Sequence, residues 1–138
     1  GHAGDSDFDN LTLVNWNEIQ EMVDSGLATV GSHTYDMHYL VDDKPIFFDS
    51  ERKIDFLDDL IKSKSTIETN LKGVEVADFA YPYGEGKDEL VPIIKEAGFL
   101  SAYILAPRVI SEENASYWQN RILVDDTVFQ EIVVPWLK

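Results

Sequence analysis

Short apolar runs alternate with longer helical segments along these 138 residues, and this order constrains the fold more than any other feature. Four apolar runs predict strands, at residues 28–31, 77–81, 99–104 and 121–124. Four segments with helical periodicity predict helices, at residues 16–25, 50–71, 88–97 and 126–137. No hairpin signal separates consecutive strands, which favours an α/β fold with a parallel sheet.

Capping residues and an apolar stripe define the predicted helices more closely. Asn15 can cap the first helix, with Glu18 three residues later completing a capping box, and Asp126 is expected to cap the last helix. The second helix has an apolar stripe formed by Ile54, Leu57, Ile61 and Leu71 and broadened by Phe56, Leu60 and Ile67. This stripe is the predicted core-facing side of that helix.

The composition is that of one globular domain, with 44% hydrophobic and 12% aromatic residues. The 11 basic and 26 acidic residues give a formal net charge of −15, which disfavours nucleic acid as a partner because phosphates would be repelled. The absence of cysteine from the sequence excludes disulfides, thiolate metal sites and cysteine nucleophiles. No apolar run approaches the length of a membrane span.

Two of the three histidines, His33 and His38, lie five residues apart after the first predicted strand. On a straight helix this spacing would turn the rings about 140° apart, and on a strand it would put them on opposite faces. The rings can converge on one ion only if the chain bends between them, as in the predicted loop 34–49. Neutral imidazole is the commonest protein ligand for zinc, so a shared metal ion is one interpretation. Two loop histidines without a shared partner are the alternative.

A turn-forming sequence at residues 82–86 follows the predicted strand 77–81. In parallel α/β folds, sites form at the carboxyl ends of strands, so this turn and the histidines could face one cleft. A loop there can present backbone N–H groups to a developing oxyanion. An ion held by His33 and His38 could polarise a carbonyl group and acidify a water molecule. These parts together indicate metal-assisted hydrolysis of an acyl group.

The two segments resemble motifs two and three of the polysaccharide deacetylases, the NodB-homology carbohydrate esterases. The first is Ser32-His33-Thr34 with His38, and the second runs from Phe79 to Gly84. Many family members have one residue fewer between the histidines. The five-residue step, together with the Ala-Tyr-Pro-Tyr-Gly sequence, is similar to the poly-N-acetylglucosamine deacetylases of biofilm systems. Further matches at residues 21–27, 94–99 and 121–123 extend the resemblance over nearly the whole chain.

The resemblance implies one domain over residues 1–138, built as a partial distorted (β/α) barrel that lacks its first strand or strands. It implies a divalent metal ion, most often zinc, and hydrolysis of N-acetyl groups from a polysaccharide that contains N-acetylglucosamine. His33 and His38 would then be metal ligands. The backbone at Tyr83 would help to hold the oxyanion, with Pro82 fixing the loop.

The resemblance also assigns roles around this centre. Tyr81 and Trp118 are candidate sugar-binding platforms. The arginine that often opens motif three is Ala80 here, so the role of orienting the catalytic base falls to Arg121, to Arg108 or to no residue. The implied partner is a polysaccharide, poly-N-acetylglucosamine or a related polymer. The implied location is extracellular or at the surface of a bacterial cell, with surface association through regions outside this chain.

Two elements of the family pattern are not found in the sequence. A strand ending in Asp-Asp should supply the base and a third metal ligand, and the Asp-Asp pairs at 42–43, 58–59 and 125–126 come too late for it. They are interpreted as loop, helix surface and cap. No histidine follows His38 to act as general acid, and His2 is the remaining one. The chain is therefore expected to be N-terminally incomplete and, by itself, inactive.

Two other readings compete with the deacetylase. A non-catalytic carbohydrate-binding or scaffold module could keep the same fold without the base. A metal-free α/β structural domain could carry the two histidines by accident. A strand ending in Asp-Asp upstream of Gly1 would favour the enzyme, and metal analysis would test the third reading.

Overall fold

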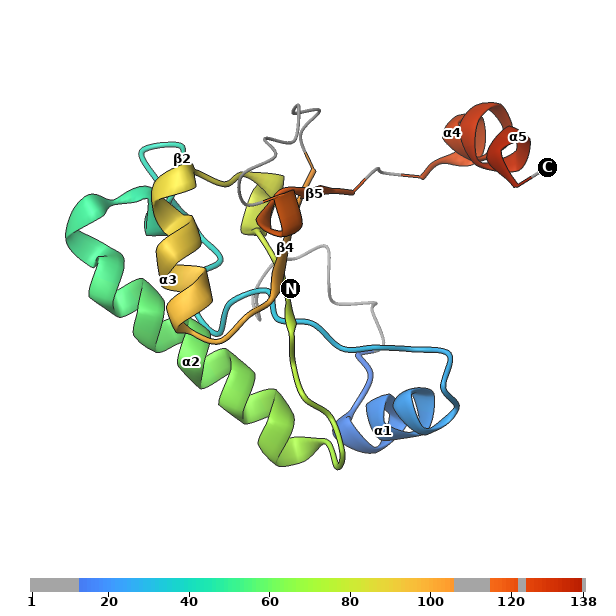
Figure 1. The fold of residues 1–138 in the computed structure, drawn as a ribbon, viewed down its shortest axis with the longest axis horizontal. Coiled ribbons are helices and arrows are strands. Elements are labelled where there is room, and N and C mark those ends of the chain that lie inside the picture. The colour runs from blue at the N-terminus through green and yellow to red at the C-terminus, as the bar shows by residue number, and fades with distance from the viewer. Residues whose placement is uncertain (1–12, 106–114, 122–123, 138) are drawn as a thin grey trace.

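A three-stranded parallel sheet forms the centre of the protein. The computed structural model describes residues 13–105, 115–121 and 124–137. The sheet consists of β3 (Asp78–Ala80), β4 (Ser101–Ile104) and β5 (Gln119–Asn120), in the order β3-β4-β5. Phe79 is paired with Ala102, and Tyr103 with Gln119. The parallel α/β sheet predicted from the sequence is confirmed (Figure 1).

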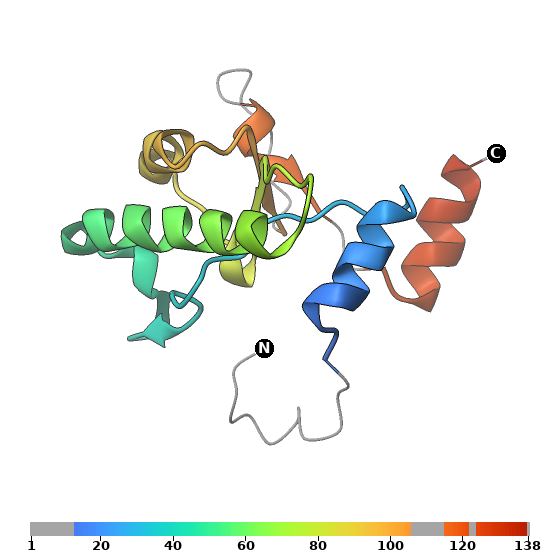
Figure 2. The same cartoon turned by 90° about the horizontal axis from the view of Figure 1, so that it is seen from below.

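Two helices, α2 (Lys53–Asn70) and α3 (Val91–Glu96), run side by side next to the sheet (Figures 1 and 2). Each is preceded by a 3₁₀ turn, Ser50–Arg52 before α2 and Asp88–Leu90 before α3. The core between helices and sheet is apolar and fully buried; it includes Phe56, Leu60, Phe79, Ile94, Phe99, Ala102 and Ile104. Burial of these side chains is the main force that holds the helices on the sheet.

The first helix, α1 (Trp16–Asp24), begins with the predicted capping box. The Asn15 side chain accepts hydrogen bonds from the backbone N–H groups of Asn17 and Glu18, and the Glu18 carboxylate accepts one from the Asn15 N–H. None of the residues in α1 is buried. The Gln20 side chain is hydrogen-bonded to the backbone of Lys72 at 2.7 and 3.3 Å, which ties α1 to the turn after α2.

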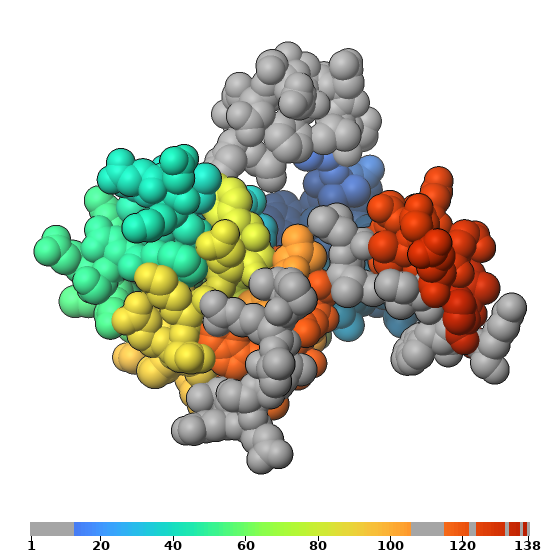
Figure 3. Space-filling view, turned by 90° about the horizontal axis from the view of Figure 1, so that it is seen from above, coloured from blue at the N-terminus to red at the C-terminus, as the bar shows by residue number. Residues whose placement is uncertain are grey.

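The C-terminal residues form one helical segment that projects from the main body (Figures 1 and 3). It comprises α4 (Asp126–Val128), a π-helical turn (Phe129–Val133) and α5 (Val134–Trp136). Its N-cap is Asp125, whose side chain accepts a hydrogen bond from the Val128 N–H at 2.8 Å. The sequence analysis placed the cap at Asp126, one residue too late. The two adjacent aspartates are equivalent as caps in sequence, and the backbone conformation selects the first.

Two of the predicted strands lie elsewhere. Residues 28–31 are not a strand, and the chain pairs with β3 only at Ser32, through a parallel bridge to Phe79. The strand predicted at 121–124 is β5, two residues earlier, and residues 122–123 lie outside the described part of the chain. An apolar run indicates that side chains are buried. A strand is defined by its backbone hydrogen-bond partners, and here the neighbouring strand sets those partners.

The predicted loop 34–49 contains a hairpin that the sequence analysis missed. Strands β1 (Leu40–Val41) and β2 (Lys44–Pro45) are antiparallel and are followed by a 3₁₀ turn, Ile46–Phe48. Asp42 and Asp43 form the two-residue turn with φ values of 49° and 58°. Such turns usually contain glycine or asparagine at a left-handed position, and two aspartates are a weaker signal.

The buried face of α2 differs from its predicted apolar stripe. Phe56 and Leu60 are buried, but Ile54 and Ile61 are 75% and 47% exposed. Their places on the buried face are taken by Asp59 and Ser63. The prediction that the 58–59 pair lies on the helix surface is therefore wrong for Asp59. The other predicted positions are confirmed, because Leu71 is buried and Leu57 and Ile67 pack against the core. The prediction failed at Ile54 and Ile61 because it did not consider polar side chains with buried partners.

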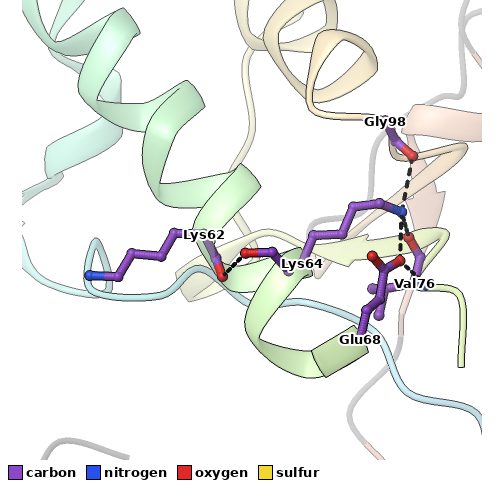
Figure 4. A network of polar contacts seen from close by, with 6 residues as sticks. Lys62, Lys64, Glu68, Val76 and Gly98 are labelled. Carbon is purple, nitrogen blue, oxygen red and sulfur yellow. Dashed lines mark hydrogen bonds and ion pairs between the residues drawn. The ribbon is translucent and has the colours of Figure 1, made fainter. Parts of the chain in front are cut away.

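Lys64 connects α2 to two other parts of the fold (Figure 4). Its ammonium group donates to the carbonyl oxygens of Val76 and Gly98, and it pairs with the Glu68 carboxylate at 3.2 Å. Glu68 in turn accepts a hydrogen bond from the Val76 N–H at 2.9 Å. This bond and the interaction with Lys64 lower the pKa of Glu68 below its ordinary value of 4.5. The network fixes the end of α2 against the segment that enters β3.

Replacement of Glu68 by glutamine should make the fold less sensitive to acid. Because the pKa of Glu68 is lower in the folded chain, its stabilisation is complete above about pH 4.5 and is lost as the pH falls through the folded-state pKa. We expect Glu68→Gln to lower the free energy of unfolding by roughly 1 kcal/mol at pH 7, with a smaller difference at pH 3. Denaturant titrations at several pH values measure this, with Glu75→Gln as the exposed control. If the free energies of unfolding of Glu68→Gln and of the unmodified chain differ by the same amount at pH 7 and at pH 3, the Glu68 carboxylate does not stabilise the fold in this way.

Candidate active site

The backbone of Ser32 extends the sheet on the open edge of β3. Its N–H donates to the Asp78 carbonyl oxygen at 2.8 Å, and its own carbonyl oxygen accepts from the Ala80 N–H at 2.8 Å. The Ser32 side chain is buried and forms a 2.7 Å hydrogen bond with the hydroxyl of Ser63 in α2. Because successive side chains of an extended segment point to opposite faces, His33 faces away from α2 and lies at the carboxyl end of β3.

His33 is oriented by a hydrogen bond to the backbone of Ala80. Its Nδ1 atom lies 2.7 Å from the Ala80 carbonyl oxygen. A carbonyl oxygen can only accept, so Nδ1 carries the proton and, in the neutral ring, Nε2 carries the lone pair. A histidine that binds a metal ion is usually held this way, with one ring nitrogen donating to the protein and the other available to the ion.

The chain between the two histidines turns so that their rings meet. The ring centroids of His33 and His38 are 4.7 Å apart, with an angle of 75° between the planes. The turn begins at Thr34, which has a φ of 74°, an uncommon conformation for a residue with a branched side chain. This is the bend that the five-residue spacing requires, and it brings together the two predicted ligands.

The turn after β3 lies against the second histidine. Pro82–Gly84 forms a 3₁₀ turn in which Tyr83 and Gly84 both have left-handed backbones, with φ values of 59° and 74°. The rings of Tyr83 and His38 have centroids 4.7 Å apart. Pro82 is buried, whereas Tyr83 is 41% exposed. The structure therefore brings the turn and both histidines to the same end of the sheet.

The surroundings of His33 favour its neutral form. Desolvation by the neighbouring protein lowers the pKa of His33 below 6.5, and the positive charge of Arg121 lowers it further. The hydrogen bond to Ala80 raises the pKa of His33, but by less than desolvation lowers it. The neutral imidazole is the form that binds metal ions.

The donor set fits two of the ligands of a zinc ion. With Zn–N distances of about 2.0–2.1 Å and tetrahedral angles, two imidazole rings on one ion have centroids about 5 Å apart, close to the separation of His33 and His38. Within the described ranges, no group of three or more His, Asp or Glu side chains could hold a metal ion. Any third protein ligand would have to come from elsewhere than these residues.

Arg121 lies next to His33 at the edge of the sheet. Its backbone N–H donates to the Ile104 carbonyl oxygen at 2.7 Å, and its Nη2 donates to the Tyr81 carbonyl oxygen at 3.2 Å. Its Nε is buried and has no hydrogen-bond partner among the described residues. Arg121 and His33 both line an open cavity of about 340 Å³, together with Thr29, Gly31, Ser32, Asp78, Phe79, Ala80 and Tyr103. Arg108, the alternative for orienting a base, lies outside the described residues.

The two predicted sugar platforms are part of the core. Tyr81 is fully buried and Trp118 is 4% exposed, and their rings stack with centroids 5.8 Å apart. Burial raises the pKa of Tyr81, and its hydroxyl has no hydrogen-bond partner among the described residues. This placement gives no support to a platform role, because neither ring presents a face to a ligand. Trp118 instead packs beside Gly86, where a Cβ atom would lie 2.9 Å from its ring.

Asp59 is a polar residue near the site whose position the sequence analysis missed. Its carboxylate, 9% exposed, accepts hydrogen bonds from the backbone N–H groups of Tyr35 and Asp36, at 2.9 and 2.7 Å. A signal was available, because Asp59 shares one helical face with the apolar residues Phe56 and Leu60. A polar residue in such a place implies a buried partner.

Comparison with known proteins identifies the family of this chain. The sequence model described as Polysaccharide deacetylase matches residues 4–102, and this chain belongs to that family. It is similar to the poly-beta-1,6-N-acetyl-D-glucosamine N-deacetylase of Staphylococcus aureus (strain MRSA252), with 31% identity over 99% of this chain and 47% of that protein. The chain thus spans about half the length of the curated relatives it matches.

Solved structures agree with this assignment and with the fold. The structure of IcaB from Ammonifex degensii has a TM-score of 0.77 and 31% identity, covering 91% of this chain and 54% of that one. A polysaccharide deacetylase from Bacillus cereus has a TM-score of 0.65 and 24% identity over 94% of this chain and 38% of that one, which shows the fold alone. The α/β chain described above is therefore a partial deacetylase barrel.

Gly84 is required by both conformation and space. It has a φ of 74°, and a Cβ atom there would lie 2.2 Å from the Leu105 Cβ and 2.9 Å from its backbone nitrogen. Gly86, which the turn sequence also emphasises, is not in a left-handed conformation; a Cβ there would instead lie 2.9 Å from the rings of Tyr81 and Trp118.

Gly84→Ala should destabilise the chain by roughly 2–4 kcal/mol, from the left-handed backbone and the contact with Leu105. Gly73→Ala is the matched control, because Gly73 has a φ of 73° and open space around its Cβ position. We expect the control to cost only about 1 kcal/mol, the conformational part alone. Equilibrium unfolding measures both variants. Equal losses of unfolding free energy in the two variants would show that the contact with Leu105 does not contribute to the destabilisation.

Proposed function

We propose that this chain carries part of the active site of a metal-dependent hydrolase that removes N-acetyl groups from a polysaccharide containing N-acetylglucosamine. The supporting observation is the pair of imidazoles, with rings 4.7 Å apart and the Nδ1 of His33 held by Ala80. Family membership and the names of the relatives support deacetylation of a poly-N-acetylglucosamine. The metal ion itself is a proposal.

His33 and His38 would hold a divalent metal ion, and zinc is the proposed ion because two neutral imidazoles suit it. When bound, such an ion polarises the amide carbonyl of the substrate and makes water more acidic. The backbone N–H at Tyr83 is proposed to donate to the oxyanion that develops at the same carbonyl. Pro82 and the left-handed conformations at Tyr83 and Gly84 keep that backbone in place.

Arg121 is proposed to orient the general base. Its guanidinium is anchored on the Tyr81 carbonyl oxygen, lies beside His33 and still has a buried donor, Nε, without a partner among the described residues. A carboxylate would satisfy that donor. The base, like the third metal ligand, is proposed to be an aspartate that the described residues do not include.

The setting of the reaction follows from the substrate class. A biofilm polysaccharide lies outside the cell, so we propose an extracellular or cell-surface location. None of the described helices is both long and apolar enough to cross a membrane. Peripheral association with the surface would involve regions outside this chain. A non-catalytic sugar-binding module is the competing function, favoured only by the lack of a third ligand among the described residues.

The histidines should be essential to deacetylation. In the parent protein that contains this chain, His33→Ala and His38→Ala should each reduce acetate release from N-acetylglucosamine oligomers by at least a hundredfold, because each removes a metal ligand. His2→Ala is the control and should leave activity unchanged. Acetate is measured with an enzyme-coupled assay in the presence of added Zn²⁺. Activity that persists in both variants would exclude a metal site at this pair.

The 138-residue chain by itself should release acetate far more slowly than a longer protein that contains it. General-base assistance contributes roughly a hundredfold to ten-thousandfold, and the described residues offer no aspartate that completes a three-residue metal site with the histidines. Both proteins are assayed with the same oligomers and Zn²⁺. Equal rates would show that the base lies within these 138 residues.

A further inference from the structure

We propose that Asp59 is a positioning residue that sets the approach of His38 to His33 and thereby tunes the affinity for the metal ion. This inference rests on the proposed function, because it assigns a role to Asp59 within that metal site. Asp59 lies in α2, 21 positions beyond His38 in the sequence, and outside the motifs on which the family resemblance was built.

The contacts of Asp59 fall between the two histidines. One carboxylate oxygen accepts from the Tyr35 N–H at 2.9 Å, and the other accepts from the Asp36 N–H at 2.7 Å. Both oxygens are therefore used on consecutive amides of the short turn that separates His33 from His38. Hydrogen bonds to an ionised acceptor are roughly twice as strong as neutral ones. The carboxylate thus holds the middle of the turn against the helix.

The same face of α2 holds this segment at two more points. Ser63, one turn after Asp59, is hydrogen-bonded to Ser32 at 2.7 Å. The ammonium group of Lys62 lies 4.0 Å from the centroid of the Tyr35 ring. Positions 59, 62 and 63 are neighbours on a helix surface. The helix therefore contacts the chain on both sides of His33, before it at Ser32 and after it at Tyr35 and Asp36.

The turn needs such support because its backbone is unfavourable by itself. Thr34 has a φ of 74°, and a conformation of this kind persists only where neighbouring contacts fix it. Asp59 is buried without an ion-pair partner among the described residues, so its burial is compensated mainly by the two amides. Without the carboxylate the turn loses this support, and we expect the distance between the His38 and His33 rings to change.

Asp59→Asn is the direct test, since the amide side chain can accept one of the two hydrogen bonds but opposes the other with a donor. Asp58→Asn is the matched control, because Asp58 is the adjacent residue and is exposed. All chains carry His2→Ala to remove a competing imidazole. Zn²⁺ affinity is measured by following the ring signals of His33 and His38 by NMR. We expect Asp59→Asn to weaken Zn²⁺ binding roughly tenfold to a hundredfold and Asp58→Asn to leave it unchanged.

A double-mutant cycle with His38→Ala separates positioning from general loss of structure. If Asp59 acts through His38, Asp59→Asn should change the residual Zn²⁺ affinity of the His38→Ala chain less than twofold. A full tenfold loss in that background would overturn the proposal. Unchanged Zn²⁺ affinity in the single variant Asp59→Asn would also overturn it.

If Asp59→Asn does not fold, amide hydrogen exchange in the chain with native Asp59 provides a second test. The amides of Tyr35 and Asp36 should be protected, and protection should increase when Zn²⁺ binds. Exchange of these amides at the rate of an unfolded peptide would overturn the proposal. A folded chain that binds no Zn²⁺ would instead overturn the metal part of the proposed function. If the amides of Tyr35 and Asp36 were protected in that chain, Asp59 would have a structural role only.

Discussion

The site depends on the two backbone hydrogen bonds by which Ser32 joins the edge of β3. They fix the register between the segment that carries His33 and the strand that leads to Tyr83. A shift of one residue would turn His33 toward α2 and Ser32 toward the site, because side chains alternate along an extended segment. The bond from His33 to the Ala80 carbonyl oxygen exists only in this register. The geometry of the imidazole pair is thus a consequence of sheet pairing, although Ser32 contributes only one bridge to the sheet.

Left-handed backbone conformations are concentrated on either side of the imidazole pair. Thr34 lies between the histidines, and Tyr83 and Gly84 lie in the turn that contacts His38. Neither Thr34 nor Tyr83 is a residue that favours this conformation, so the surrounding contacts must stabilise it. Asp59 does so for the first turn, and the close approach of Gly84 to Leu105 does so for the second. Both turns are supported by groups that are distant in sequence and that take no direct part in the proposed chemistry.

The chain spans about half the length of its curated relatives. It holds a larger share of the fold than of the groups proposed for catalysis. It contributes an imidazole pair, the turn Pro82–Gly84 beside it, and an arginine with a buried donor that has no partner among the described residues. Among the described residues no group of three could hold a metal ion, and Arg121 and Asp78 line the same open cavity as His33.

The sequence by itself determined the family, the parallel α/β order, the Asn15 capping box and the two histidines whose rings the fold brings together. These features depend on local pattern: residue spacing, capping chemistry and short motifs. Only the tertiary structure decided that Asp59 is buried, that Asp42 and Asp43 turn a hairpin, and that Tyr81 and Trp118 belong to the core. Asp59 and the Tyr81–Trp118 pair depend on partners remote in sequence, such as the amide of Tyr35 for Asp59. The hairpin is local, but two aspartates are only a weak turn signal. The helical pattern can indicate that Asp59 is buried, but its hydrogen-bond partners are set by the whole fold.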